Sequence, residues 1–554
     1  MSTSMNHNCC QFETISYMAG AIILMTLVLS FTFSAIIMLA GFSQCAWTFP
    51  LSLILSTGYI FSVDVGIKIR IQAIAAVVGC IGLSIVMCAW FEDPSYDGNT
   101  YHQETIARIL SKWNPYWMID DLPSDMSPWT RHYAKGLEII SSSIAAFTGS
   151  IESGKAVNLM LMSATAFLLH PFLRWLIPGI SLRSNIILII ALVANPVAMS
   201  QMLTFYIDYS KYFYILLSII LSCRLTVSQN RVGSMCDSLL LSGVILLAIA
   251  TKFNIFFEEG ICMFAIIVWQ LICGRIRGVR RVCACGISAL LVGVLLCFHP
   301  YVTNYITSGH PLYPLMGNCS VDIMTKNTPE LFSHGRIINF FLSYLTPTIP
   351  TYAARVNGFG FVTTILLILS VVVFVRSHRY VPVWMWYGLV VTLVSCFMYD
   401  QLWWARYVCQ LWLVPCMAFM VTLIYAPHNN VWMRRAFSSM ILLGAILSFS
   451  STLYISARLT VVRQFLYEMG RLRKIEVSYT APSLERHFSE YGIEVTTVST
   501  ETFSRCEKTG QISYYGEIGD AAYFPTIIAT PSEIDAFTEW GRNFGFDVIK
   551  MSSK

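Results

Sequence analysis

Long apolar runs recur along the chain from Ile15 to Ser456, separated by short polar connections. Each run approaches the roughly 20 residues that a helix needs to cross a bilayer. The first run follows no basic segment and has no small-residue cleavage site, so we expect a retained helix rather than a signal peptide. The pattern predicts about thirteen spans, with 46–63 the weakest because Pro50 interrupts it: 16–42, 46–63, 71–91, 156–175, 184–202, 205–223, 235–251, 255–273, 283–299, 357–375, 381–399, 407–426 and 433–456.

Composition agrees with an α-helical polytopic membrane protein. The 554 residues are 56% hydrophobic and 12% charged, whereas a soluble domain carries roughly a quarter charged residues. Most of the 17 cysteines lie inside apolar runs, where they act as small hydrophobic side chains, and no Cys/His spacing typical of a metal site occurs. The net charge of +5 carries little information about partners, because membrane proteins concentrate Lys and Arg in cytoplasmic loops, and it is no evidence for nucleic acid. The apolar runs make a lipid bilayer the expected partner, and we expect no nucleic acid.

The connections alternate in charge, and this alternation predicts the topology. One set is short, rich in Lys and Arg and almost free of acids, which is typical of cytoplasmic loops. The other set is richer in acids and aromatics, and it comprises 92–155, 203–212, 300–356 and 400–406. We therefore place this second set outside the bacterial cytoplasmic (inner) membrane, facing the periplasm or the exterior. An odd number of spans also puts the C-terminal tail outside, although Arg458, Arg463 and Arg471 would favour the cytoplasm.

Two regions do not read as spans. The segment from Arg131 to Ser150 is amphipathic, and we expect a helix that lies along the outer interface. The tail from about Val477 has the pattern of a small α/β domain, with helices at 483–491 and 532–544 and strands at 494–498 and 526–529. The predicted domains are thus two additional N-terminal transmembrane helices (1–70), a transmembrane region with outer loops 92–155 and 300–356 (71–456) and an α/β C-terminal domain (457–554), expected in the periplasm.

Polar side chains are unusually dense directly after the predicted span 71–91. Asp93, Asp97, Asn99, Tyr101 and His102 lie within ten residues, where a plain connecting loop needs only general polarity. Four further predicted outer connections carry charged groups and aromatics at helix ends. Among these groups are Asp208, Lys211, Lys252 and Arg406.

Each of these groups also has an ordinary structural role. Aromatics anchor helices at the interface, and lone cations extend from helix ends toward the polar headgroups. The convergence of the charged connections on one side of the membrane is what favours a functional site.

Such a set of side chains suits the transfer of a sugar from a phosphate-bearing lipid. A carboxylate can deprotonate the attacking hydroxyl or bind a divalent ion. Lys and Arg can stabilise the charge that develops on a phosphate leaving group. Aromatic rings can pack against a sugar or a polyprenyl tail, and the bilayer supplies the donor laterally.

Five segments in a fixed order resemble one known group of enzymes. They are SYDGNTYHQETIARILSKWNPY, HYAKGLEIISSSI, QMLTFYIDYSKY, ATKFN and NYITSGHPLYPL. They resemble the bacterial GT-C-fold membrane glycosyltransferases, the broad group that contains protein O-mannosyltransferases, aminoarabinose transferases and oligosaccharyltransferase catalytic subunits. The resemblance covers about residues 70–425 and names no subfamily.

The resemblance implies roles for individual residues. Asp97 would be the catalytic base, with Asp93 as the fallback, and Asp208 would be the second acid. Lys252 and Arg406, with Lys211 and Arg355 behind them, would bind the lipid phosphate. Asn99, Tyr101 and His102 would lie at the substrate, and His102 either orients Asp97, binds the sugar or is an ordinary loop histidine.

This sequence departs from the family pattern in two ways. The acidic loop follows the third predicted span instead of the first, which the two extra N-terminal spans would explain. The acids are single rather than an Asp-X-Asp pair. A divalent cation (Mg or Mn) therefore remains an open expectation, and we assign no metal ligands.

The leading hypothesis is a glycosyltransferase with a polyprenyl-phosphate-linked sugar donor and an envelope glycan, lipid or protein acceptor. One alternative is a polysaccharide polymerase or ligase that uses a lipid-pyrophosphate donor. Another is a lipid-linked glycan transporter or flippase, which would place ionisable groups near the bilayer midplane. A scaffold whose tail binds a partner leaves the acidic loop unexplained.

Overall fold

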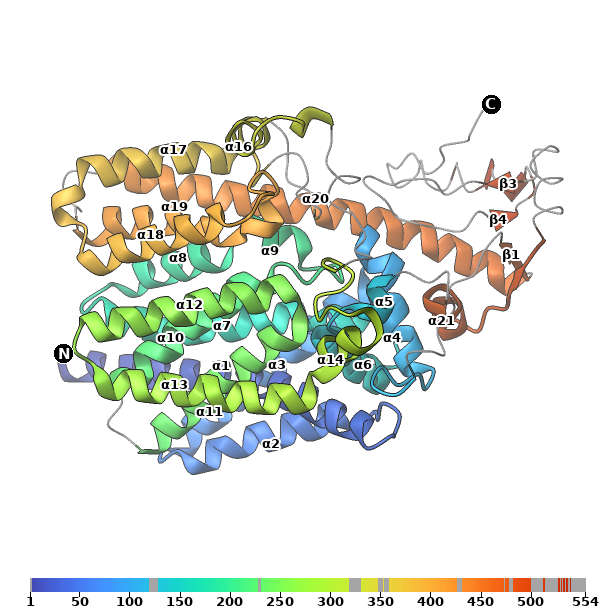
Figure 1. Cartoon of the computed structure of the whole chain (residues 1–554), viewed down its shortest axis with the longest axis horizontal. Coiled ribbons are helices and arrows are strands. Elements are labelled where there is room, and N and C mark those ends of the chain that lie inside the picture. Colours follow the sequence, from blue (N-terminus) through green and yellow to red (C-terminus); the bar gives the residue numbers. More distant parts are fainter. Residues whose placement is uncertain are drawn as a thin grey trace.

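The computed structural model is a bundle of helices whose axes lie roughly parallel, with a small sheet beyond one end (Figure 1). It describes residues 2–118, 128–227, 231–317, 330–346, 352, 358–425, 431–472, 474–477, 482–499 and parts of 512–539. Arg355, one of the predicted phosphate ligands, lies outside these residues.

Nine helices in the described part of the chain are long and apolar enough to cross a membrane. This finding confirms a helical polytopic membrane protein. These helices comprise residues Gln11–Leu39, Ile67–Trp90, Glu152–Leu176, Ser210–Val227, Gly233–Thr251, Phe253–Ile272, Ile276–Leu296, Ala405–Ile424 and Val431–Ala457.

The four other predicted spans fall on shorter helices, and the total of thirteen stays a prediction. They are α2 (Thr48–Ser62), α8 (Leu182–Val193), α17 (Phe361–Arg376) and α18 (Val383–Phe397). The predicted span 184–202 is divided because Pro196 cannot donate a backbone hydrogen bond and Asn195 caps a new helix, accepting from the Val197 amide at 2.9 Å. The new helix is α9 (Pro196–Gln201).

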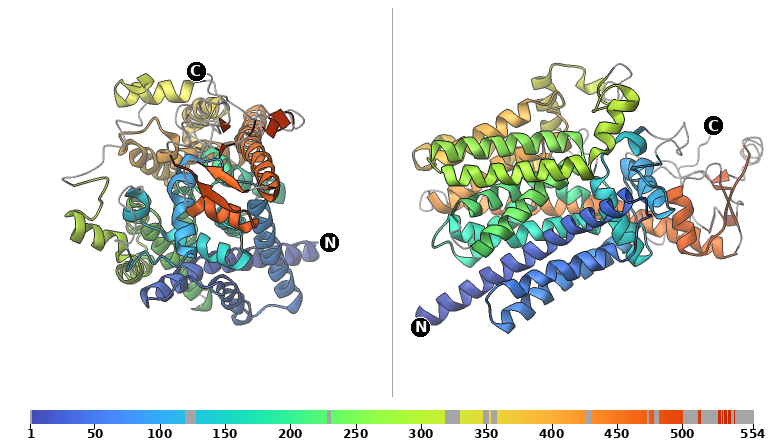
Figure 2. Two further views of the ribbon diagram at one scale, coloured as in Figure 1. Left: turned by 90° about the vertical axis from the view of Figure 1, so that its right-hand side faces the viewer. Right: turned by 60° about the horizontal axis from the view of Figure 1, so that its bottom comes forward.

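The first two helices belong to the packed bundle. α1 (Ser2–Leu39) packs against α2, α3 (Ile67–Trp90) and α7 (Ala156–Leu176). Figure 2 (right) shows α1 and α2 side by side along one flank of the bundle. Ile22, Ile23 and Leu24 of α1 are fully buried, so this helix contributes to the core.

The other bundle helices follow in chain order. They are α10 (Ser210–Val227), α11 (Arg231–Thr251), α12 (Phe253–Ile272), α13 (Ile276–Leu296), α19 (Leu413–Met420) and α20 (Val431–Leu472). α19 continues the 3₁₀ helix η6 (Ala405–Trp412) and leads into the π-helix η7 (Val421–Tyr425).

Short helices fill the connections. Those of the first predicted outer loop are the π-helix η1 (Gly98–His102), α4 (Gln103–Leu110), α5 (Pro128–His132), α6 (Gly136–Thr148) and the 3₁₀ helix η3 (Glu152–Lys155). Later ones are α14 (Phe298–Ser308), η4 (Glu330–Phe332), α16 (Arg336–Leu345) and η5 (His378–Tyr380). α4, α5, α6 and α14 gather at the end of the bundle that faces the sheet (Figure 1).

The predicted interfacial helix at 131–150 is wrong in its placement. The segment does form α6, but every residue of α6 from Gly136 to Ala145 is buried. α6 packs against α1, α4, α11 and η3, so its polar residues face protein instead of the membrane surface. Gly136 permits this close packing, since a Cβ there would lie 2.7 Å from Ala250.

α20 carries the chain from the bundle to the C-terminal domain. It continues to Leu472, well beyond the predicted end of the last span, and its Thr460 hydroxyl accepts a hydrogen bond from the Glu92 amide at 3.0 Å. The C-terminal region therefore lies at the same end of the bundle as the first predicted outer loop. Figure 2 (left) looks onto this end, with the sheet toward the viewer.

The C-terminal sheet has four short strands in the order β2-β1-β4-β3. β1 (Ile475–Val477) is parallel to β2 (Val495–Thr497) and antiparallel to β4 (Ile527–Ile528), which pairs with β3 (Ile512–Ser513). The predicted helix at 483–491 is α21 (Pro482–Glu490), and both predicted strands are present. The predicted helix at 532–544 lies largely outside the described residues.

Candidate active site

Four charged residues from four separate connections form a continuous chain of contacts. Arg406 donates a hydrogen bond to Asp97 at 2.9 Å and lies 3.6 Å from Asp208. Lys252 donates to the other oxygen of Asp208 at 2.8 Å. The predicted second and fourth outer connections thus meet the first one. We refer to Asp97, Asp208, Lys252 and Arg406 as the acidic centre.

Breaks in helices place these four side chains. Asp97 directly precedes η1, and Asp208 lies in the short connection between α9 and α10. Lys252 has extended backbone angles between α11 and α12, which turns its side chain out of the helical register. Arg406 belongs to η6 rather than to a regular helix. Each charge therefore lies where the backbone departs from a straight bundle helix.

Burial and pairing decide the charge state of the centre. Burial alone would raise the pKa of Asp208, but the charges of Lys252 and Arg406 outweigh it and hold this pKa below its ordinary value. Burial alone would lower the pKa of Lys252, but the Asp208 carboxylate raises it more, and the pKa of Lys252 lies above its ordinary value. Both residues are thus ionised at neutral pH. Two carboxylates balance two cations in the centre.

Aromatic rings form the walls of the centre. The Arg406 guanidinium lies 4.4 Å from the ring centroid of Trp404, 5.0 Å from that of Tyr206 and 5.4 Å from that of Tyr407. On the other side, Tyr133 lies 6.0 Å from the Lys252 ammonium and meets the ring of Tyr101 edge-on. Rings in contact with cations stabilise them and offer flat faces to a sugar.

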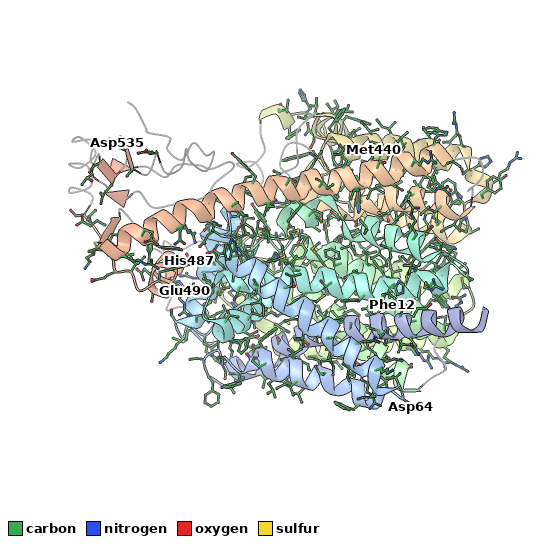
Figure 3. All side chains as sticks on the ribbon, turned by 180° about the vertical axis from the view of Figure 1, so that it is seen from behind. Phe12, Asp64, Met440, His487, Glu490 and Asp535 are labelled. Atoms are coloured by element: carbon green, nitrogen blue, oxygen red, sulfur yellow. The ribbon has the colours of Figure 1, made fainter. Side chains whose placement is uncertain are left out.

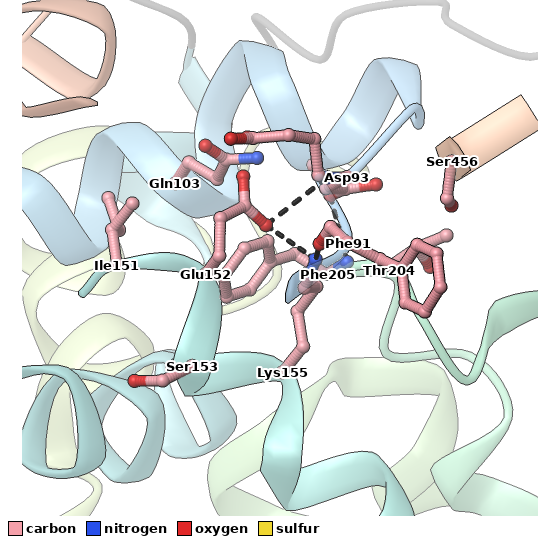
Figure 4. Close-up of polar contacts among 12 residues, drawn as sticks. Phe91, Asp93, Gln103, Ile151, Glu152, Ser153, Lys155, Thr204, Phe205 and Ser456 are labelled. Atoms are coloured by element: carbon pink, nitrogen blue, oxygen red, sulfur yellow. Dashed lines mark hydrogen bonds and ion pairs between the residues drawn. The ribbon is translucent and has the colours of Figure 1, made fainter. Parts of the chain in front are cut away.

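Asp93, the fallback base, lies apart from this centre. Its carboxylate is fully buried and accepts hydrogen bonds from the Ser95 amide and hydroxyl and from the Phe205 amide at 2.8–3.0 Å. Burial raises its pKa to about 6. Figure 4 shows Asp93 beside Glu152, which also contacts Lys155. This geometry favours a role in shaping the loop.

His102 and Asn99 form their hydrogen bonds with residues other than Asp97. His102 is buried and its Nδ1 lies 2.6 Å from Glu138 of α6. Asn99 donates to the carbonyl oxygens of Asp93 and Ser95 at 2.9 and 2.8 Å, which closes the turn. Of the three predicted substrate-binding residues in this loop, Tyr101 contacts the acidic centre through its ring, which meets that of Tyr133.

Lys211 lies in the first turn of α10 and contacts Tyr407 and Tyr399. Its ammonium donates to the Tyr407 carbonyl and lies 4.7 Å from the ring centroid of Tyr399. Lys211 thus anchors the residue that follows Arg406, and this position supports η6 rather than a direct contact with a ligand.

Lys135 is a candidate that the sequence interpretation did not select. Its ammonium donates to the Tyr133 carbonyl at 2.7 Å and lies 3.1 Å from Nε2 of His299. Burial lowers its pKa to about 7, and no carboxylate in the described part of the chain is within ion-pair distance. A narrow pocket borders Lys135, His299 and Tyr116. Since Tyr133 contacts both Lys135 and Lys252, this cation adjoins the acidic centre.

Two sets of carboxylates are relevant to a divalent ion. In the acidic centre, the Arg406 guanidinium already lies between Asp97 and Asp208, so a side-chain cation links the acids. Elsewhere, Glu92, Glu152 and His487 place one ligand atom each within 4.8 Å of one another. Arg463 contacts both of these carboxylates, so an ion there would have to displace its guanidinium.

Comparisons with known proteins do not assign the chain to a family. No protein-family model matches it, and no curated protein matches it either. The resemblance to GT-C-fold glycosyltransferases therefore rests on the five sequence segments alone.

Proposed function

We propose that this protein is a membrane glycosyltransferase of the GT-C type. It transfers a sugar from a polyprenyl-phosphate donor to an envelope glycan, lipid or protein on the outer side of the cytoplasmic membrane. The observation that carries this proposal is the convergence of Asp97, Asp208, Lys252 and Arg406, with their aromatic walls, at one end of a membrane bundle.

Asp97 is the residue that we assign as general base. Its side chain is 15% exposed, whereas Asp208 is 2% exposed and forms ion pairs with two cations. Arg406 donates to Oδ2 of Asp97, which leaves Oδ1 for the hydroxyl of the acceptor. As the acceptor oxygen bonds to the anomeric carbon, its proton passes to Asp97 and the bond from that carbon to the phosphate oxygen breaks.

Lys135 is the cation that we assign to the departing phosphate. Lys252 and Arg406 are already balanced by carboxylates, so a phosphate there would add an unbalanced negative charge. Among the described residues Lys135 has no such carboxylate partner, and an anion beside it would recover the cost of burying its charge. In this assignment Lys252 and Arg406 are not the primary phosphate ligands that the resemblance implies. They instead bind and position the carboxylates of Asp97 and Asp208.

The neighbouring surface suits a polyprenyl chain. The first turn of α14 contains His299, which contacts the Lys135 ammonium. Farther along the same helix, Val302, Tyr305 and Ile306 are exposed. In a membrane this face lies against lipid, so an isoprenoid tail could pack along α14 while its phosphate reaches Lys135.

The alternatives fit less well. A lipid-pyrophosphate donor carries a second phosphate, which would need more unbalanced positive charge than Lys135 supplies. A transporter would use ionisable groups near mid-membrane. Glu258 and Glu259 are buried in α12, but they lie within two turns of its start at Phe253, close to the acidic centre, and they bind Gln410 and Ser218.

A strain that lacks the protein tests this function without knowledge of the sugar. We expect its lipid extract to accumulate one polyprenyl-phosphate sugar and its envelope to lose the same sugar, as measured by mass spectrometry. The wild-type protein should restore both, and Asp97→Asn should restore neither although it reaches the membrane. An unchanged lipid and glycan profile would contradict the proposal.

A further inference from the structure

A second cluster of buried polar and charged side chains joins the C-terminal region to the loop that carries Asp97. Its members are Glu92 after α3, Glu152 of η3, Arg463 of α20 and His487 of α21, and each is at most 6% exposed. We call these four residues the latch. Figure 3 places His487 where α21 meets the bundle, with Glu490 beside it.

Arg463 is the centre of the latch. Its guanidinium donates to the Glu92 carboxylate, lies 3.5 Å from Glu152 and donates to the side-chain oxygen of Asn99 at 3.3 Å. One side chain of α20 thereby contacts three positions, and two of them, Glu92 and Asn99, lie on the segment that runs from the end of α3 into η1. The Tyr467 hydroxyl, one turn farther along α20, also donates to Glu92.

α21 adds a parallel set of contacts to the same region. His487 Nε2 lies 2.7 Å from the Gln103 side-chain oxygen and 3.4 Å from Glu152. Glu490 accepts from the Ile151 amide at 2.9 Å, and the Ser483 amide donates to Glu104 at 3.3 Å. Both ends of α21 therefore bind α4 or the segment that leads into η3.

These contacts bear directly on Asp97 because the turn that holds it is closed by latch partners. Asn99, which accepts from Arg463, closes the turn through the carbonyl oxygens of Asp93 and Ser95. Gly98, next to Asp97, packs so tightly that a Cβ there would lie 1.8 Å from the Asp93 carboxylate. A shift of Asn99 therefore moves Asp97 away from Arg406.

The chemistry of the latch favours positioning over simple adhesion. Apolar contacts would join the same elements without the cost of burying charges. Burial raises the pKa of Glu92, although the positive charge of Arg463 opposes this shift. Burial and the charge of Arg463 both lower the pKa of His487, so this histidine is neutral. Directed hydrogen bonds from a rigid guanidinium fix one arrangement of the loop, which an apolar contact does not.

We propose that Arg463 and His487 are positioning residues, through which the C-terminal region holds the first outer loop so that Asp97 stays beside Arg406. The inference rests on the proposed function, since it takes Asp97 as the base. The inference assigns a function to the C-terminal domain, in which we recognise no sequence motif. When the contacts of the latch are formed, Asp97 lies beside Arg406. When they are broken, Asp97 is displaced.

The test compares Arg463→Gln with Arg471→Gln in the full-length protein in lipid nanodiscs. Arg471 is on the same helix but is 56% exposed and pairs only with Glu468 among the described residues. Hydrogen exchange of residues 92–110 reports the loop directly. We expect faster exchange there in Arg463→Gln, an intermediate rate in Arg463→Lys, and wild-type exchange in Arg471→Gln.

Kinetics separate positioning from general damage. With the cell's own polyprenyl-phosphate sugars as donor, Arg463→Gln should lower kcat about 10-fold to 100-fold while the donor KM stays unchanged, because a displaced base affects the chemical step. Arg463→Lys should recover part of kcat. His487→Gln should resemble Arg463→Gln in both measurements.

Three outcomes would overturn the inference. They are unchanged exchange of residues 92–110 in Arg463→Gln, faster exchange with wild-type kcat, and a rise in KM alone. If the wild-type protein releases no polyprenyl phosphate, the proposed function fails, but the exchange measurement still decides whether the latch holds the loop.

Discussion

Arg406 donates a hydrogen bond to Asp97 at 2.9 Å although the two residues are 309 positions apart in the chain. The contact joins the first predicted outer loop to η6, and the same guanidinium nitrogen lies 3.6 Å from Asp208. One cation thus lies between two carboxylates that come from different connections. This relationship gives the two aspartates different environments, and the first prediction follows from that difference.

Asp208→Asn should destabilise the protein far more than Asp97→Asn. Asp208 is 2% exposed, and its loss leaves Lys252 and Arg406 buried without their shared partner. Removal of one member of a buried pair typically costs about 3–5 kcal/mol. We expect a clearly lower melting midpoint for Asp208→Asn in detergent and a shift of at most a few degrees for Asp97→Asn. Equal shifts would contradict the distinction.

Lys135→Met should make the protein more stable and inactive. Methionine has a similar length and removes a buried charge that has no carboxylate partner in the described part of the chain. We expect a gain on the order of 1 kcal/mol at neutral pH, which corresponds to a few degrees in the melting midpoint, together with loss of sugar transfer. A variant that is less stable, or that keeps full activity, would rule out the assignment of Lys135 to the phosphate.

The stability gained by Lys135→Met should depend on pH. The Lys135 pKa is about 7 in the folded protein and 10.5 in its ordinary state. Between these values the unfolded chain holds a proton that the folded protein lacks, so wild-type stability rises with pH by about 1.4 kcal/mol per unit. The advantage of Lys135→Met is therefore largest near and below pH 7, disappears about one pH unit above it and reverses toward pH 10. An advantage independent of pH would contradict the burial of an uncompensated charge.

Gly98→Ala should disturb the loop that carries Asp97. A Cβ at Gly98 would lie 1.8 Å from the Asp93 carboxylate and 2.3 Å from the Ser95 hydroxyl, so the turn must open. We expect a loss of about 1–3 kcal/mol in stability and a lower kcat. Gly82→Ala in α3 is the control, since no described atom beyond the backbone of its own helix lies within 4 Å of its Cβ position. If Gly98→Ala keeps wild-type stability and kcat, the turn accommodates the added Cβ and the prediction is wrong.

Cysteine labelling tests on which side of the membrane the site lies. In a background without reactive cysteines, Tyr96→Cys should react with a membrane-impermeant maleimide in intact spheroplasts, because Tyr96 is 42% exposed beside Asp97. His378→Cys, at the predicted cytoplasmic end, should react only after permeabilisation. The reverse pattern would place the acidic centre in the cytoplasm.

The sequence predicts the bundle and the convergence of its polar connections well, because apolar length and loop charge are local signals. Contacts confirm that the loops with Asp97, Asp208 and Arg406 meet at one end of the bundle. The break before Pro196 and the extent of α20 beyond Ser456 were missed, since a helix can end within an apolar run or continue past one.

The partners of each charge could not be predicted from the sequence. Asp93 and Asp97 are four positions apart, yet Asp93 binds the Phe205 amide and Asp97 binds Arg406. Lys135 belongs to the segment 131–150, whose amphipathic pattern predicts an interfacial helix, whereas tertiary packing buries every residue from Ala134 to Ala145. Arg463 looked only like a topology signal. Its role depends on contacts 371 positions away, at Glu92, which no local pattern encodes.

Release of polyprenyl phosphate by the purified protein tests the central claim most directly. The protein in nanodiscs is incubated with lipid extract from the deletion strain, which supplies the accumulated donor, and with envelope material as acceptor. Mass spectrometry then measures free polyprenyl phosphate. Asp400→Asn is the matched control, since its side chain is 89% exposed. We predict release by the wild type and by Asp400→Asn, and a rate at least about 100-fold lower for Asp97→Asn. Equal release by Asp97→Asn, or none by the wild type, would contradict the account.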